Sequence, residues 1–112
     1  MKIYHNPKCT KSRQTLQLLR DHHIEPEIIE YLTSPPTVQE LDGILKKLNM
    51  EPAELVRKKE ARELKLDFES LDRDAAIAVL VENPRVIERP IVVAGRKAVI
   101  GRPPENVLGL LE

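Results

Sequence analysis

Cysteine and aromatic residues are scarce in this sequence. One cysteine, one phenylalanine, two tyrosines and no tryptophan occur among its 112 residues. A single thiol cannot form an internal disulfide, which excludes a disulfide-rich secreted scaffold and favours a reducing cytoplasm. With so few aromatics, a hydrophobic core has to be built from Leu, Ile, Val and Ala.

Secretory and membrane signals are missing as well. The N-terminal residues MKIYHNPK contain no apolar segment of the kind that signal peptides carry. No apolar run approaches the roughly 20 residues that a transmembrane helix needs. We therefore expect a cytoplasmic protein with no membrane partner.

An excess of charge of one sign is also missing, because 18 Lys and Arg residues balance 18 Asp and Glu residues. This balance argues against a nucleic-acid partner held by bulk positive charge, although it leaves room for a local anion site. Hydrophobic residues make up 41% and charged residues 32%, as in ordinary globular proteins. We expect one domain over residues 1–112, since this length can bury a core without metal or disulfide support.

The N-terminal part of the chain alternates between strand-like and helix-like patterns. Residues 2–5 (KIYH) are β-prone and end at Asn6-Pro7. From Thr10, leucines at near-helical spacing predict a helix that ends around residues 21–22. Residues 27–32 (EIIEYL), which follow a proline, predict a second strand.

Helical patterns fill the middle of the chain. Thr37 with Glu40 three residues on is a capping-box pattern that predicts the start of a helix. Residues 52–59 predict a further helical turn or two, and residues 64–68 a connector. Residues 72–81 (DRDAAIAVLV) predict another helix, closed by an Asn-Pro pair.

The C-terminal part predicts a hairpin and a last helix. Residues 91–93 and 97–100 are the two strands, residues 94–96 are the turn, and a Pro-Pro pair precedes a helix over residues 105–111. The order is therefore β-α-β, then helices, then β-β-α. It predicts an α/β, thioredoxin-like fold with a helical insertion at about residues 37–83 between its two halves.

The cysteine lies at or just before the N-terminus of the first predicted helix, within HNPKCTKSR. Free backbone amides and the helix dipole there favour a thiolate, which is the nucleophilic form. Lys8 and Lys11 flank Cys9 and Arg13 lies one turn along, so their charges act in the same direction. The same amides can bind an anion. Many lone cysteines simply pack in a core, and that interpretation stays open.

The spacing around Cys9 excludes other kinds of chemistry. Ser12 takes the last position of a would-be Cys-x-x-Cys motif, so a second thiol has to come from another molecule. Arg13 follows too soon for a Cys-x5-Arg phosphatase loop, and no Cys/His cluster has the spacing of metal ligands. His5 either tunes the thiol or holds its loop by a hydrogen bond, or it is an ordinary residue at a strand end.

Three arginines are candidates for holding an oxyanion that Cys9 attacks. Arg57 begins a basic run, Arg89 directly precedes a proline at the entry of a strand, and Arg102 follows the hairpin. A guanidinium offers several directed N–H donors to a tetrahedral oxyanion, better than an ammonium does. On context alone, a solvated surface charge is the better explanation for each of the three.

Four segments together resemble the glutaredoxin-coupled arsenate reductases, and more narrowly their short bacterial relatives, over essentially the whole chain. The segments are IYHNPKCTKSR (3–13), LVRKKE (55–60), NPRVIERPIVV (83–93) and IGRPPENVL (100–108). The resemblance implies a thioredoxin-like fold with an inserted helical bundle. It also implies reduction of arsenate to arsenite, with glutathione as co-substrate, glutaredoxin as a further reductant, and no metal or bound cofactor.

The resemblance also assigns roles to individual residues. It makes Cys9 the nucleophile and lets three arginines hold arsenate and its thiol adduct. The proline after the second arginine is expected in cis, and the remaining motif residues support the cysteine. The arsenate-binding residues so implied are Arg57, Arg89 and Arg102, and the supporting residues are His5, Ser12, Arg13 and Pro90.

Two other functions remain open. Spx-type regulators share this fold and bind RNA polymerase, but they typically carry a Cys-x-x-Cys switch where this chain has Ser12. A glutathione-dependent thiol oxidoreductase with another substrate would use the same cysteine.

Two departures from the plasmid-borne resistance enzymes place this chain, by resemblance, with the chromosomal relatives. Those enzymes carry smaller or less charged residues where this chain has Lys8, Thr10 and Lys11. They also have a longer C-terminal tail than this sequence.

Overall fold

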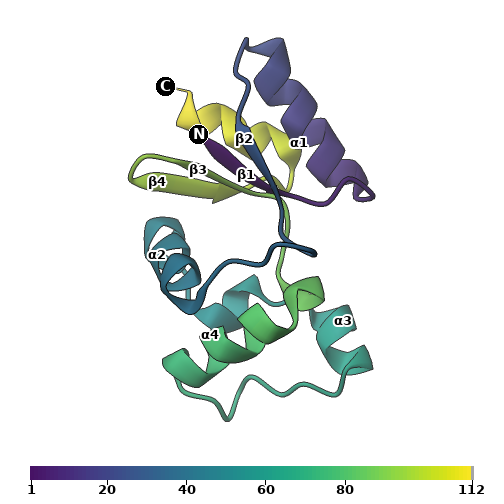
Figure 1. Cartoon of the computed structure of the whole chain (residues 1–112), viewed down its shortest axis with the longest axis vertical. Coiled ribbons are helices and arrows are strands. Elements are labelled where there is room, and N and C mark those ends of the chain that lie inside the picture. Colours follow the sequence, from purple (N-terminus) through teal and green to yellow (C-terminus); the bar gives the residue numbers. More distant parts are fainter. Residues whose placement is uncertain (112) are drawn as a thin grey trace. The chain divides into compact units, whose positions relative to one another are not determined.

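The computed structural model describes residues 1–111, and the chain divides into two compact units (Figure 1). The first unit comprises Met1–Ser34 and Arg89–Glu112, and the second unit comprises Pro35–Glu88. Each unit has its own set of secondary-structure elements. The prediction that they form one domain with a helical insertion stays a prediction.

A mixed four-stranded sheet organises the first unit. Its strands are β1 (Lys2–His5), β2 (Glu27–Glu30), β3 (Ile91–Ala94) and β4 (Lys97–Ile100), in the order β2-β1-β3-β4. β1 is parallel to β2 and antiparallel to β3, and β3 is antiparallel to β4. The parallel pair is joined by helix α1 (Thr10–Asp21), as a parallel connection requires (Figure 1). The predicted α/β class, the β-α-β start and the hairpin are therefore confirmed.

The core of the first unit lies between this sheet and two helical elements. The inner strands β1 and β3 are largely buried, whereas the edge strand β2 is mostly exposed. Helix α1 and the 3₁₀ helix η3 (Pro104–Leu110) pack against each other and onto one face of the sheet. The buried side chains that join them are aliphatic, as the scarcity of aromatics predicts: Ile3, Leu16, Leu19, Val92 and Val107.

The regular elements of the second unit are helices, apart from one isolated β-bridge. Its elements are α2 (Val38–Leu48), η1 (Pro52–Leu55), α3 (Lys58–Glu63), α4 (Arg73–Glu82) and η2 (Pro84–Val86). Thr37 caps α2: its side chain accepts from the Glu40 amide, and the Glu40 side chain accepts from the Thr37 amide, each at 3.1 Å. The predicted capping box is thus confirmed. Buried leucines on α2, η1 and α4 build the core of this unit.

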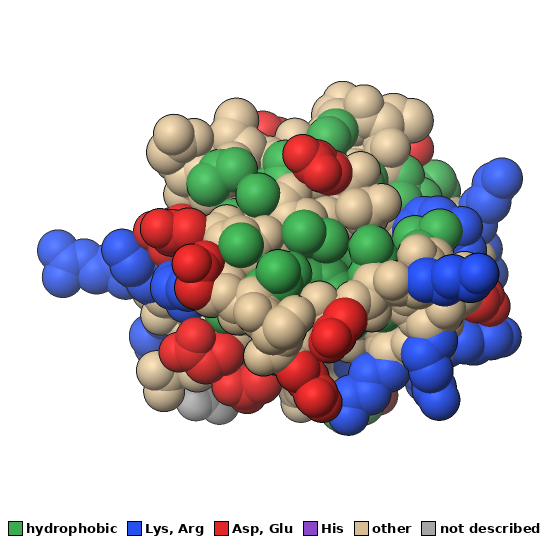
Figure 2. Space-filling view, turned by 90° about the horizontal axis from the view of Figure 1, so that it is seen from below, with side chains coloured by type: hydrophobic (Ala, Val, Ile, Leu, Met, Phe, Trp, Pro, Cys, Tyr) green, Lys and Arg blue, Asp and Glu red, His purple; other side chains and the backbone are tan. Residues whose placement is uncertain are grey.

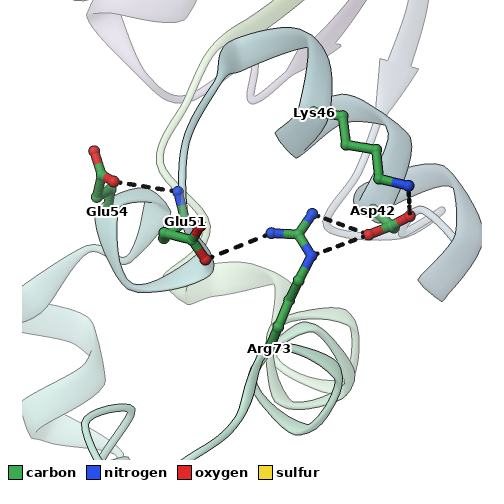
Figure 3. Close-up of polar contacts among 5 residues, drawn as sticks. All are labelled: Asp42, Lys46, Glu51, Glu54 and Arg73. Carbon is green, nitrogen blue, oxygen red and sulfur yellow. Dashed lines mark hydrogen bonds and ion pairs between the residues drawn. The ribbon is translucent and has the colours of Figure 1, made fainter.

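A charged network links α4 to α2 (Figure 3). Arg73, the first residue of α4, donates to Oδ1 of Asp42 through Nε at 3.2 Å and Nη2 at 2.9 Å. Lys46 contacts the other oxygen of Asp42 at 3.1 Å, and Glu51 lies 3.6 Å from Nη1 of Arg73. Hydrogen bonds from Arg73 and then Lys46 hold the pKa of Asp42 below its usual value.

Apolar side chains also reach the surface of the second unit. Helix α4 is apolar on all sides over AAIAVLV; Ala76, Ile77 and Leu80 are buried and the others are half-buried. A groove of about 800 Å³ runs along residues 53–69, with Leu66 and Phe68 in its lining. Figure 2 shows hydrophobic side chains gathered in the middle of the face seen from below, with acidic and basic side chains around them.

Three predicted elements differ in extent or type. β2 ends at Glu30 because the chain turns there, with the amide of Ser34 donating to the Glu30 carbonyl at 2.9 Å. The helical segment predicted at 52–59 is split, since Val56 forms a β-bridge with Ile87 between η1 and α3. The last helix is a 3₁₀ helix over Pro104–Leu110.

The hairpin turn is also tighter than predicted. Ala94 pairs with Lys97, so the loop is the two residues Gly95 and Arg96. Gly95 has a φ of 59°, a left-handed conformation that glycine adopts without steric cost.

Candidate active site

The loop that carries Cys9 is a tight turn between β1 and α1. The Cys9 amide donates to the Asn6 carbonyl at 3.0 Å, and the Lys8 amide donates to the Asn6 side-chain oxygen at 3.0 Å. Asparagine at the first position and proline at the second are the residues this kind of turn prefers. Asn6-Pro7 therefore does more than end the strand, because it sets the path of the backbone into Cys9.

Cys9 is the N-cap of α1. Its backbone is extended, with φ −93° and ψ 123°, and its side chain makes no capping hydrogen bond. The first helical bond runs from the Arg13 amide to the Cys9 carbonyl at 3.0 Å. The amides of Thr10, Lys11 and Ser12 consequently have no acceptor within the helix. The first turn contains no acidic side chain, so these amides and the positive end of the helix dipole can receive an external anion.

His5 and Ser12 hold the cysteine loop from inside. Nδ1 of His5 and Oγ of Ser12 lie 2.6 Å apart, and Oγ also accepts from the Asn6 amide at 3.1 Å. Both side chains are buried. The geometry is that of a residue that fixes the loop by a hydrogen bond, while a role for His5 in tuning the thiol stays a prediction.

Burial lowers the pKa of His5. The imidazolium loses solvation inside the fold, and this is the largest effect; Glu30 opposes it, while Arg20 and Arg13 add to it. His5 therefore holds its neutral form to lower pH than a solvated histidine does.

Arg13 ties the same loop from outside. Its Nη1 donates to the Pro7 carbonyl at 3.0 Å and its Nη2 to the Thr10 hydroxyl at 3.3 Å. Both contacts are exposed, and neither reaches the sulfur. The predicted supporting residue thus lies beside the loop, on the outside of its turn.

Arg102 is brought to the sulfur from the far end of the chain. Its Nη2 lies 3.6 Å from Sγ of Cys9, a hydrogen bond between residues 93 positions apart, and its Nε donates to the Arg89 carbonyl at 2.7 Å. Cys9 is 9% exposed, so the sulfur lies just under the surface with a cation against it. The Arg89–Pro90 bond is cis, as the resemblance implied.

Arg57 lies in the second unit. It is the N-cap of α3, its amide donates to the Val86 carbonyl at 2.7 Å, and its Nη2 pairs with Glu60 at 3.2 Å. Nη1 has no hydrogen-bond partner in the described part of the chain. The first unit therefore brings Arg102 to the cysteine loop and bonds it to the Arg89 carbonyl, while the roles of the Arg89 side chain and of Arg57 stay predictions.

Three residues near these groups were not singled out from the sequence. Gly101 and Thr15 touch each other beside Arg102, and Glu60 pairs with Arg57. Glu60 could have been found, because it lies three residues after Arg57 on the same helix. Gly101 and Thr15 could not, because their contact joins elements 86 residues apart.

Metal and membrane signals are absent from residues 1–111. No group of three His, Cys, Asp or Glu side chains there could hold a metal ion. Within the same residues, no helix is long and apolar enough to cross a membrane.

A thiol at a helix N-terminus with a guanidinium against its sulfur suits a thiol that reacts with an anion. A sequence model of the ArsC family matches residues 4–110. The chain belongs to the ArsC family. This match confirms the resemblance read from the four sequence segments.

Similar proteins align with this chain over nearly its whole length. A Neisseria meningitidis protein named arsenate reductase is 43% identical, over 99% of this chain and 97% of its own. The uncharacterized protein YfgD of Escherichia coli is 51% identical, over 99% of this chain and 96% of its own. The solved structure of an arsenate reductase from Vibrio cholerae superposes with a TM-score of 0.90 at 46% identity, covering 97% of both chains.

Proposed function

We propose that this chain reduces arsenate to arsenite, with the Cys9 thiolate as nucleophile and glutathione and glutaredoxin as reductants. The observation that carries the proposal is the contact between Nη2 of Arg102 and the Cys9 sulfur at 3.6 Å, at the N-terminus of α1. Relatives named arsenate reductase that align over the full length support it.

The proposal includes a thioredoxin-like fold for the first unit. Its support is the order β2-β1-β3-β4 with a parallel pair, an antiparallel hairpin and helix α1 between β1 and β2. In such a fold the residue before a cis proline lies beside the first helix. Arg89 has this position in the chain, directly before the cis Pro90.

In the first step, arsenate binds at the free amides of α1 and the thiolate attacks arsenic. A sulfur–arsenic bond forms, and one arsenate oxygen leaves as water after taking up protons. Arg102, Arg89 and Arg57 hold the charge on the remaining oxygens, and electrostatic stabilisation of this kind is usually the largest catalytic effect.

The second step needs two electrons, because arsenic goes from the pentavalent to the trivalent state. Two thiols supply them by joining into a disulfide. The only cysteine here is Cys9, so the electron-donating thiols come from other molecules, glutathione and glutaredoxin. The glutathione thiol first binds the arsenic of the adduct, and the glutaredoxin thiol then attacks the glutathione sulfur, so a glutathione–glutaredoxin disulfide leaves and the arsenic keeps the electron pair. Water then displaces the Cys9 sulfur from the trivalent arsenic, which releases arsenite and restores the thiol. This chemistry needs the reducing conditions of the cytoplasm.

The testing experiment measures arsenate-dependent oxidation of glutathione in the presence of glutaredoxin. We expect turnover in the wild-type protein and none in Cys9→Ser, with the same far-ultraviolet circular dichroism in both. Glutathione oxidation by Cys9→Ser at the wild-type rate would remove Cys9 from the reaction. A wild-type protein that does not turn over arsenate, but whose Cys9 is rapidly alkylated, would instead point to a thiol oxidoreductase with another substrate.

RNA polymerase binding is less well supported. Spx-type regulators carry a second cysteine at the position of Ser12. The Ser12 side chain is buried here, and its hydroxyl is hydrogen-bonded to the His5 ring and to the Asn6 amide. The position therefore has a structural use in this chain. Capture of RNA polymerase by the immobilised protein would reverse this preference.

A further inference from the structure

Gly101 sits where no side chain fits. It is buried at the end of β4, and a Cβ built on it would come within 2.9 Å of Cγ of Pro90 and of Cγ2 of Thr15, and closer still to Oγ1 of Thr15. Its φ is outside the left-handed region. Glycine is therefore required here by space and not by backbone conformation.

The two residues 101 and 102 are tied to the segment before β3. The Gly101 amide donates to the Pro90 carbonyl at 2.9 Å, and Nε of Arg102 donates to the Arg89 carbonyl at 2.7 Å. These bonds make the β4 end and the Arg89–Pro90 segment one local body. Arg102 extends from this body to the Cys9 sulfur.

On the opposite side of this contact, Thr15 lies on helix α1, which carries Cys9 at its N-cap. The Thr15 side chain is fully buried, and its hydroxyl donates to the Lys11 carbonyl at 2.8 Å, with the Gly101 carbonyl at 3.4 Å. Because the hydroxyl is bonded to its own helix, Thr15 has little freedom to turn away from an added methyl group. The clash with Thr15 would therefore be relieved by moving α1 away, whereas the contact with Cγ of Pro90 would have to be relieved within the β4 end itself.

The distances show that such a movement matters. Ordinary contact between a Cβ and its neighbour begins at 3.4 Å, whereas the Cβ built on Gly101 would come within 2.9 Å of Cγ2 of Thr15 and closer still to its Oγ1. A separation of more than half an ångström is needed. The hydrogen bond from Arg102 to the sulfur is 3.6 Å long, and such a bond weakens further as its donor and acceptor separate. A movement of α1 by this amount would therefore weaken the hydrogen bond from Arg102 to the Cys9 sulfur.

We propose that Gly101 is a positioning residue for the candidate reaction. The missing side chain lets α1 approach the β4 end closely enough for Arg102 to donate to the Cys9 sulfur. The proposal rests on the proposed function for its effect on turnover, but its effect on the sulfur can be measured without any arsenate.

The experiment compares Gly101→Ala with the double variant Thr15→Ala/Gly101→Ala. Two readouts are used: arsenate turnover with glutathione and glutaredoxin, and the rate of Cys9 alkylation by iodoacetamide at neutral pH, which follows the thiolate fraction. We expect Gly101→Ala to lower both by about tenfold, the loss of roughly one hydrogen bond to a charged group. Removing the Thr15 hydroxyl and methyl group eliminates two of the three close contacts and leaves the one with Cγ of Pro90, so the double variant should regain part of both rates.

Two control variants separate positioning from stability. Gly109→Ala makes the same substitution in the same unit where an added Cβ meets nothing within 4 Å, and it should behave as wild type. Val107→Ala opens a cavity at a fully buried position of the core, and it should lower the melting temperature while leaving alkylation unchanged.

Several outcomes would overturn the proposal. Wild-type alkylation in Gly101→Ala would show that the contact does not set the sulfur's environment. If Val107→Ala and Gly101→Ala had equal melting temperatures and lost the same fraction of the alkylation rate, the loss would be a general effect of lowered stability. If Gly101→Ala does not fold, failure of the double variant to regain alkylation also refutes the proposal. If the wild-type protein did not reduce arsenate, only the proposed function would be refuted. The alkylation rates of wild type and Gly101→Ala would still decide the role of Gly101.

Discussion

Replacing Arg102 tests the arrangement around the sulfur most directly. Its guanidinium donates to the Cys9 sulfur at 3.6 Å and to the Arg89 carbonyl at 2.7 Å. Arg102→Ala removes both, together with the positive charge. Arg102→Lys keeps the charge but cannot reproduce the directed donors of a planar guanidinium.

The size of the effect follows from the kind of bond that is lost. Removing one preorganised donor from a developing oxyanion costs about 3–4 kcal/mol, and a hydrogen bond to a charged group is worth about 1.5–3 kcal/mol. Arg102 is half-buried, so we take roughly 2–3 kcal/mol for the alanine variant. This corresponds to a loss in kcat/KM of about 30- to 150-fold. The lysine variant should lie between alanine and wild type.

The assay is arsenate-dependent glutathione oxidation, with iodoacetamide alkylation of Cys9 as a second measurement. Arg96→Ala is the matched control, because this arginine is exposed in the hairpin turn of the same unit. It should leave both rates unchanged. Wild-type kcat/KM and wild-type alkylation in Arg102→Ala would refute the reasoning, since the contact with the sulfur would then have no chemical consequence.

Three further predictions concern stability. Burial holds the folded-state pKa of His5 below its unfolded value near 6.5. The contribution of His5 to stability is therefore full above that pH and falls as the pH drops towards the folded-state pKa. The urea midpoint should fall less between about pH 7.5 and 5.5 in His5→Gln than in wild type. The pKa of Asp42 is held below 3.8, so Asp42→Asn should unfold at lower urea than wild type at pH 7 but match it once acid has protonated the carboxylate; an unchanged gap in acid would contradict this. Thr37→Ala removes the capping box and should lower the free energy of unfolding by about 1 kcal/mol, whereas an unchanged urea midpoint would mean that the cap is not needed.

Much of the fold could be predicted because it depends on neighbours in the chain. The capping box of Thr37 and Glu40 involves two residues of one helical turn, and Asn6-Pro7 specifies a turn by its own conformational preferences. The position of Cys9 at the N-cap of α1 follows from the same local signals. Errors occurred where longer-range contacts decide, as at Val56, whose bridge to Ile87 interrupts a helical pattern.

The sequence by itself therefore determined the elements, the thiol at a helix N-terminus and the family to which the chain belongs. Only the tertiary structure decided that Arg102 reaches the sulfur of Cys9 and that Gly101 has to lack a side chain beside Thr15. The physical reason is distance along the chain. Turns, caps and helical faces are set by interactions over a few residues, whereas contacts between residues 86 or 93 positions apart exist only once the sheet and its covering helices have packed.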